Sequence, residues 1–132
     1  MLFALSASAD AQQPDKVFRI GYLDVSTLSY SAGFLKSFWQ QMNKLGWVDG
    51  KNITMVYRFA EQKPGHLPEL AAELTRLGVD LIVCSGTPSV LAARNAAAAT
   101  SIVMASGGDP VAAGLVTSLA RPGGSITGLA SL

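Results

Sequence analysis

DLIVCSGTPS, residues 80–89, joins an apolar run of strand length to the start of a helix. Thr87 is a residue type that caps helices, and proline, here Pro88, is favoured at the first helical position. Three further strand-and-helix pairs repeat this pattern, and the four strands are predicted at residues 17–23, 53–57, 80–84 and 102–105. Because neighbouring parallel strands need a crossover helix between them, the alternation predicts an α/β fold with a parallel sheet.

Amphipathic helices connect these strands. The first is predicted to follow Ser31, which can cap it, and Gly46 and Gly78 are expected to end the first two helices in the left-handed conformation. A fifth strand is predicted at 125–129. The order favoured for such a sheet is 2-1-3-4-5, with helices on both faces. The sequence therefore predicts one doubly wound, five-stranded domain over residues 17–132.

The first residues differ in composition from the rest of the chain. Met1–Leu5 is apolar, and Ser6–Ala11 supplies small residues at the spacing of a signal-peptidase site. We therefore expect residues 1–11 to be the tail of a secretory signal, cleaved after Ala9 or Ala11, and the protein to be exported to the periplasm. A disordered N-terminal extension is the alternative.

Composition argues against several classes of protein. Ten basic residues against nine acidic ones give a net charge of +1 with no basic run, which argues against nucleic acid as a partner. No apolar stretch reaches the roughly 20 residues of a membrane span. The single cysteine, Cys84, excludes an internal disulfide and a Cys-rich zinc site. Residues 106–110 also lack the spacing of a phosphate loop, so we expect neither metal, cofactor nor catalytic residue.

Ligands of open parallel sheets bind beyond the carboxyl ends of the strands, where the strand order reverses. In the order 2-1-3-4-5 that point lies between the first and third strands, and loops 24–30, 85–89 and 106–109 would line it. Two predicted helix starts, at Thr87 and Asp109, would present N–H groups there that suit a carboxylate or another small anion. The predicted ligand-binding residues are Thr27, Tyr30, Ser85, Gly86, Thr87, Ser89, Gly107, Gly108 and Asp109.

Three other polar residues are interpreted as structural. Cys84 is expected to be an inert strand thiol, although a strand-end cysteine could act as a nucleophile. His66 stands at a helix start and is interpreted as a surface or capping residue. Asp24 ends the first strand, where a catalytic or metal-binding acid can lie, but no second carboxylate is evident nearby. A role in loop structure is therefore favoured for Asp24.

Five blocks in order resemble the substrate-binding proteins of ABC transporters, in the group that includes tryptophan- and tyrosine-binding members. The blocks are residues 19–23, 45–53, 67–74, 107–111 and 118–128. The resemblance implies a type I periplasmic binding fold, in which two similar flavodoxin-like lobes close on a ligand. It also implies a non-catalytic, solute-binding component of an importer, with an ABC permease as partner and a small organic solute, of which an aromatic amino acid is a candidate.

The family's second lobe is expected soon after Leu129, and the printed sequence does not contain it. We therefore expect an N-terminal lobe only, as a truncated reading frame, a fragment or a half-protein. Such a lobe should bind its ligand weakly and self-associate through residues 125–132. Two classes remain as alternatives: the effector-sensing domain of a regulator and a small flavodoxin-like enzyme.

Overall fold

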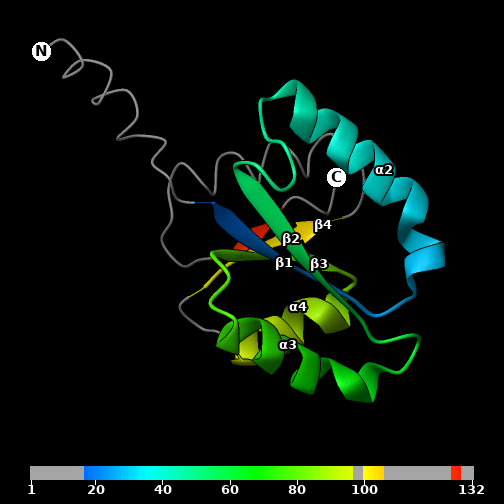
Figure 1. Cartoon of the computed structure of the whole chain (residues 1–132). Helices are drawn as coiled ribbons and strands as arrows, with labels where there is room; N and C mark the ends of the chain where they lie inside the picture. Colours follow the sequence, from blue (N-terminus) through cyan, green and yellow to red (C-terminus); the bar gives the residue numbers. More distant parts are fainter. Residues whose placement is uncertain (1–16, 97–99, 106–125, 129–132) are drawn as a thin grey trace, which may run out of the picture.

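The computed structural model describes residues 17–96, 100–105 and 126–128 of the chain, and its framework is a parallel β-sheet (Figure 1). The four longer strands are β1 (Phe18–Asp24), β2 (Ile53–Phe59), β3 (Leu81–Ser85) and β4 (Ser101–Ala105). They lie in the order β2-β1-β3-β4, and every neighbouring pair is parallel. The predicted fold class is confirmed for these four strands, including their order.

A short strand, β5 (Ile126–Gly128), pairs in parallel with residues 102–104 of β4. Residues 125 and 129, which complete the predicted fifth strand, lie outside the described residues. The helix expected to begin at Asp109 lies outside them as well.

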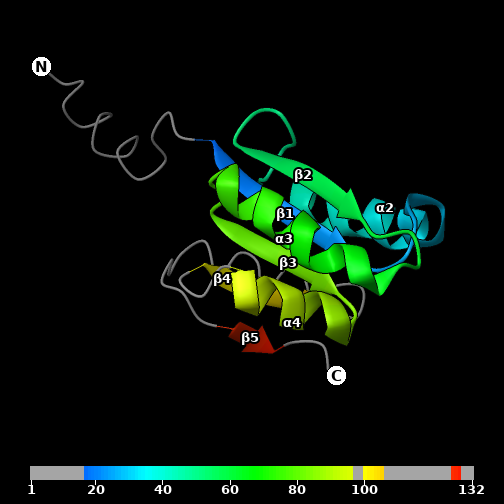
Figure 2. The same cartoon turned by 90° about the horizontal axis from the view of Figure 1, so that it is seen from below.

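Helices cover both faces of the sheet (Figures 1 and 2). Helix α2 (Leu28–Lys44) lies on one face, whereas α3 (Leu67–Arg76) and α4 (Thr87–Ala96) lie on the other. A 3-10 turn, η1 (Pro64–His66), leads into α3. Each face has its own apolar core. The core under α2 includes Tyr22, Phe38, Met42 and Val83, and the opposite core includes Leu23, Leu74, Ile82 and Ala93.

The start of α2 differs from the prediction. Thr27, in an extended conformation, is the N-cap, and its Oγ1 accepts a hydrogen bond from the N–H of Tyr30 at 3.1 Å. The prediction that Ser31 caps the helix is wrong, because Ser31 lies buried inside the first turn. The amphipathic pattern that predicted the helix does not extend to its first turn, where Leu28 and Tyr30 are 58% and 80% exposed.

Two helix ends agree with the prediction. Gly46, after α2, has a φ of +96°, and Gly78, after α3, has a φ of +71°. Their N–H groups donate to the carbonyls of Asn43 and Thr75, both at 3.0 Å. Left-handed residues at these points let the chain turn from each helix toward the next strand.

Candidate functional site

The loops after β1 and β3 meet at the carboxyl edge of the sheet. The register pairs Asp24 of β1 with Ser85 of β3 at this edge. A side-chain carbon at Gly86 would stand 3.5 Å from Cγ1 of Val25, so the two loops are in close contact. The order β2-β1-β3-β4 also reverses here, because β2 follows β1 on one side and β3 lies on the other. This is the position at which open parallel sheets bind ligands.

The structure brings five of the predicted ligand-binding residues to this edge. Thr27 and Tyr30 belong to the start of α2, and Tyr30 projects from it with its side chain largely in solvent. Ser85 is half-buried at the end of β3, and Gly86 and Thr87 are exposed at the start of α4. The predicted residues Gly107, Gly108 and Asp109 lie outside the described residues.

Ser89 takes a different position from its predicted partners. Its side chain is 0% exposed, and its Oγ has no hydrogen-bond partner among the described residues. Its carbonyl accepts a hydrogen bond from the Cys84 thiol at 3.6 Å. In this structure the Ser89 hydroxyl is therefore enclosed and does not form part of the open surface of the loop.

Helix α4 starts one residue earlier than expected. The carbonyl of Gly86 accepts hydrogen bonds from the N–H groups of Ser89 and Val90 at 3.1 and 3.3 Å, which gives Gly86 the N-cap position expected for Thr87. Gly86 has a φ of +94°, a conformation in which a residue with a side chain would be strained. Thr87 consequently lies in the first turn of α4, at the positive end of the helix dipole, and is exposed there.

Asp24 forms the centre of a buried polar cluster that the sequence did not indicate. Its carboxylate is 1% exposed and accepts four hydrogen bonds. The Tyr22 hydroxyl donates to Oδ2 at 2.8 Å, and the Ser31 hydroxyl donates to the same oxygen. The N–H and hydroxyl of Ser26 donate to Oδ1 at 2.8 and 2.7 Å. These contacts agree with the interpretation of Asp24 as a residue of loop structure.

Tyr22 keeps its proton in this cluster. Burial, reinforced by the hydrogen bond to Asp24, raises the pKa of the Tyr22 phenol well above its usual range. Tyr22 and Asp24 lie two residues apart on β1 and therefore point to the same face of the sheet. That spacing was the one signal in the sequence from which their contact could have been predicted.

The loop after β2 is bonded to the loop after β1. The N–H groups of Ala60, Glu61 and Gln62 donate to the carbonyls of Asp24, Ser26 and Val25 at 2.8, 2.9 and 2.7 Å. Glu61 and Gln62 have φ values of 54° and 69°, which are uncommon for residues with side chains. The backbone of the β1–α2 loop is therefore held from the β2 side as well as by Asp24.

Two further polar candidates are Cys84 and His66. Cys84 is 0% exposed, and burial raises the pKa of its thiol to about 12, so the reactive thiolate does not form near neutral pH. His66, the last residue of η1 and the N-cap of α3, is exposed, and its side chain makes no capping hydrogen bond. Within the described ranges, no group of three His, Cys, Asp or Glu residues could hold a metal ion.

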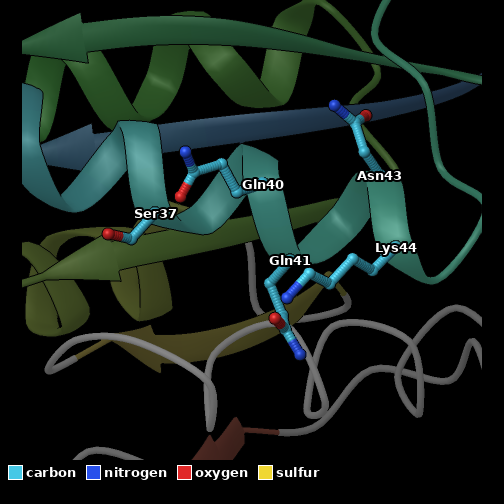
Figure 3. Close-up of a pocket in the computed structure, with 5 residues that line it drawn as sticks. All are labelled: Ser37, Gln40, Gln41, Asn43 and Lys44. Atoms are coloured by element: carbon cyan, nitrogen blue, oxygen red, sulfur yellow. The ribbon is translucent and has the colours of Figure 1, made fainter.

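Two hollows lie along α2, and the apolar one reaches the first turn of the helix at Leu28. One of about 390 Å³ is apolar and lies between α2 and β2, where the Trp39 indole N–H donates to the Tyr57 hydroxyl at 3.0 Å. The other, of about 680 Å³, follows the polar side of the helix (Figure 3). Its lining residues all project from α2: Ser37, Gln40, Gln41, Asn43 and Lys44.

Comparison with known families decides the class of protein. The model of the family described as ABC transporter substrate binding protein matches residues 29–132. The chain belongs to this family. The described residues contain no helix long and apolar enough to cross a membrane.

Relatives of this ABC substrate-binding chain agree with the assignment. A curated tyrosine-binding protein of Clostridioides difficile (strain R20291) is 37% identical over 93 residues, which are 70% of this chain and 27% of that protein. A ligand-free, open structure of a substrate-binding protein with adhesive properties from Clostridium difficile is 31% identical, with a TM-score of 0.65 over 85% of this chain and 38% of the other.

A solved structure with a bound ligand matches as well. The ABC domain from Streptococcus pneumonia in complex with L-Trp is 25% identical, with a TM-score of 0.65 over 86% of this chain and 38% of that one. The chain thus spans only about a quarter to two fifths of the length of these relatives. At the level of the family, the matches indicate a binding protein rather than an enzyme.

Proposed function

We propose that residues 17–132 form the N-terminal lobe of an exported solute-binding protein and that this lobe binds an aromatic amino acid. One observation carries the proposal: the pairing of Asp24 with Ser85 places the starts of α2 and α4 at one edge, at the reversal of strand order. Relatives described as tyrosine-binding or solved with L-Trp support the choice of solute.

The two helix starts offer complementary contacts to such a ligand. At α4, the exposed Thr87 and the positive end of a ten-residue helix suit the ligand carboxylate, with the Ser85 hydroxyl beside them. At α2, the exposed ring of Tyr30 can cover the aromatic side chain of the ligand. Gly107, Gly108 and Asp109 stay predicted contributors, because they follow β4, which adjoins β3.

The rest of the function concerns the protein beyond this lobe. We propose that a second lobe completes the site and that the closed protein delivers its ligand to an ABC permease from the periplasm. A single lobe leaves one side of the ligand in water, so the affinity of this chain alone should be weak. Self-association through residues 125–132 also stays a prediction.

The proposal predicts a preference for a free carboxylate. A charge-assisted hydrogen bond contributes about 1.5–3 kcal/mol, so L-tryptophan and L-tyrosine should bind the chain at least about tenfold more tightly than their amides. Thr87→Ala should remove most of this preference. Isothermal titration calorimetry measures both, with urea unfolding as a check on the fold. Thr75→Ala on α3 is the matched control, because the Thr75 hydroxyl bonds within its own helix to the Ala71 carbonyl.

Two outcomes would count against the proposal. If acid and amide bind equally well, or if Thr87→Ala retains the preference, the carboxylate site does not lie at α4. If neither the chain nor a protein with a restored second lobe binds any aromatic amino acid, the proposed class of solute is wrong.

A further inference from the structure

We propose that Asp24 is a positioning residue for ligand binding: by holding the first turn of α2, its buried carboxylate directs Tyr30 toward the ligand. This inference rests on the proposed function. Asp24 itself is enclosed and does not touch a ligand, since it is 1% exposed and its oxygens are occupied by protein donors.

The carboxylate joins three consecutive parts of the chain. Tyr22 lies in β1, Ser26 in the loop, and Ser31 in the first turn of α2. The hydroxyls of Ser26 and Ser31 are also 3.2 Å apart, so the loop and the helix contact each other as well as Asp24. Within the described part of the chain, Asp24 is thus the one side chain that bonds to the strand, the loop and the first turn together.

Tyr30 depends on this arrangement more than a core residue does. Its side chain is 80% exposed, so packing does little to fix its direction. Its backbone N–H is bonded to Thr27 Oγ1, and the next residue, Ser31, is bonded to Asp24. The residue is therefore placed by its backbone, and the backbone is held on both sides of it.

A carboxylate suits this role better than its amide. An ionised carboxylate has about four acceptor sites, whereas the amide of asparagine has two and presents two donors of its own. Four donors converge on Asp24, and among the described residues all of them are uncharged. Asp24→Asn would leave part of these buried donors without an acceptor.

Ser31→Ala is the cleaner variant, because it removes one donor and leaves Asp24 with its other partners. We expect it to weaken L-tryptophan binding about tenfold in calorimetry, the effect of losing one hydrogen bond to a charged group. Ser37→Ala, an exposed substitution of the same kind on the same helix, should leave affinity unchanged. In a Tyr30→Ala background Ser31→Ala should have almost no further effect, since the two changes remove the same contact.

Amide hydrogen exchange supplies a second readout that needs no ligand. Ser31→Ala and Asp24→Asn should each speed the exchange of amides 26–31 about tenfold, while amides 38–42 of the same helix keep their rates. A general loss of stability would instead speed both sets.

The outcomes separate this inference from the proposed function. Where the unaltered chain binds L-tryptophan, two results would overturn the inference. The first is that Ser31→Ala binds L-tryptophan as tightly as Ser37→Ala does. The second is that Ser31→Ala weakens binding in the Tyr30→Ala background as much as it does in the unaltered chain. If neither the unaltered chain nor a protein with a restored second lobe binds any aromatic amino acid, the proposed function fails, and exchange alone decides whether Asp24 holds the first turn. Unchanged exchange at 26–31 would then overturn the inference too.

Discussion

Phe38→Ala is expected to lower the free energy of unfolding by about 3–5 kcal/mol, the usual cost of deleting a buried aromatic ring. Phe38 is 1% exposed in the core between α2 and the sheet. Its ring lies 6.2 Å from that of Phe34 and 5.2 Å from that of Trp39, measured between centroids. Because its neighbours belong to a fixed helix and sheet, they cannot fill the cavity completely.

Urea unfolding followed by circular dichroism measures this cost. Gln40→Ala is the matched control, since Gln40 is exposed on the same helix and its loss should change stability by less than about 0.5 kcal/mol. A loss below about 1 kcal/mol for Phe38→Ala would show that α2 does not pack on the sheet as described.

Alkaline solution is expected to destabilise the chain through Cys84. Burial raises the pKa of this thiol from 9.0 to about 12. The unfolded chain therefore releases the thiol proton above about pH 9, while the folded chain keeps it until about pH 12. Stability from this group is fully present below pH 9 and falls by about 1.4 kcal/mol for each pH unit above it.

Comparison with Cys84→Ala isolates this contribution. Urea unfolding between pH 8 and 11 should give a steeper loss for the unaltered chain than for the variant. The variant should retain a smaller loss, because burial also raises the pKa values of Tyr22 and Tyr57. Equal slopes for the two proteins would contradict the burial of the thiol. Ligand binding should not depend on Cys84, to which we assign no chemistry.

The strand order could be predicted because the signals that set it are local. Apolar runs such as 81–84 mark buried strands, and Gly46 and Gly78 end helices by a conformation that glycine adopts at little cost. Once parallel strands alternate with helices, few arrangements satisfy the handedness of the crossovers. The extension of β2 to Phe59 was missed, because its last residues, on an outer strand, are only partly buried.

The contacts of Asp24 could not be predicted in the same way. Its partners come from a strand, a loop and a helix, and their approach depends on how α2 crosses the sheet. The sequence favoured Ser31 as a helix cap, because serine caps helices well in isolation. The structure instead uses its hydroxyl inside the helix to satisfy a buried carboxylate, a tertiary contact that outweighs the local preference.

The measurement that tests the central claim most directly is a titration of the 15N-labelled chain with L-tryptophan, followed by the shifts of its amide resonances. The account predicts that the largest shifts occur in two segments, 27–30 and 85–89, which the sheet brings to one edge. Resonances farther along α2, from residues that line its two hollows, such as the Trp39 indole and the Gln41 amide, should move little. Largest shifts at Trp39 and Tyr57, with residues 85–89 unaffected, would contradict a binding site at the carboxyl ends of β1 and β3.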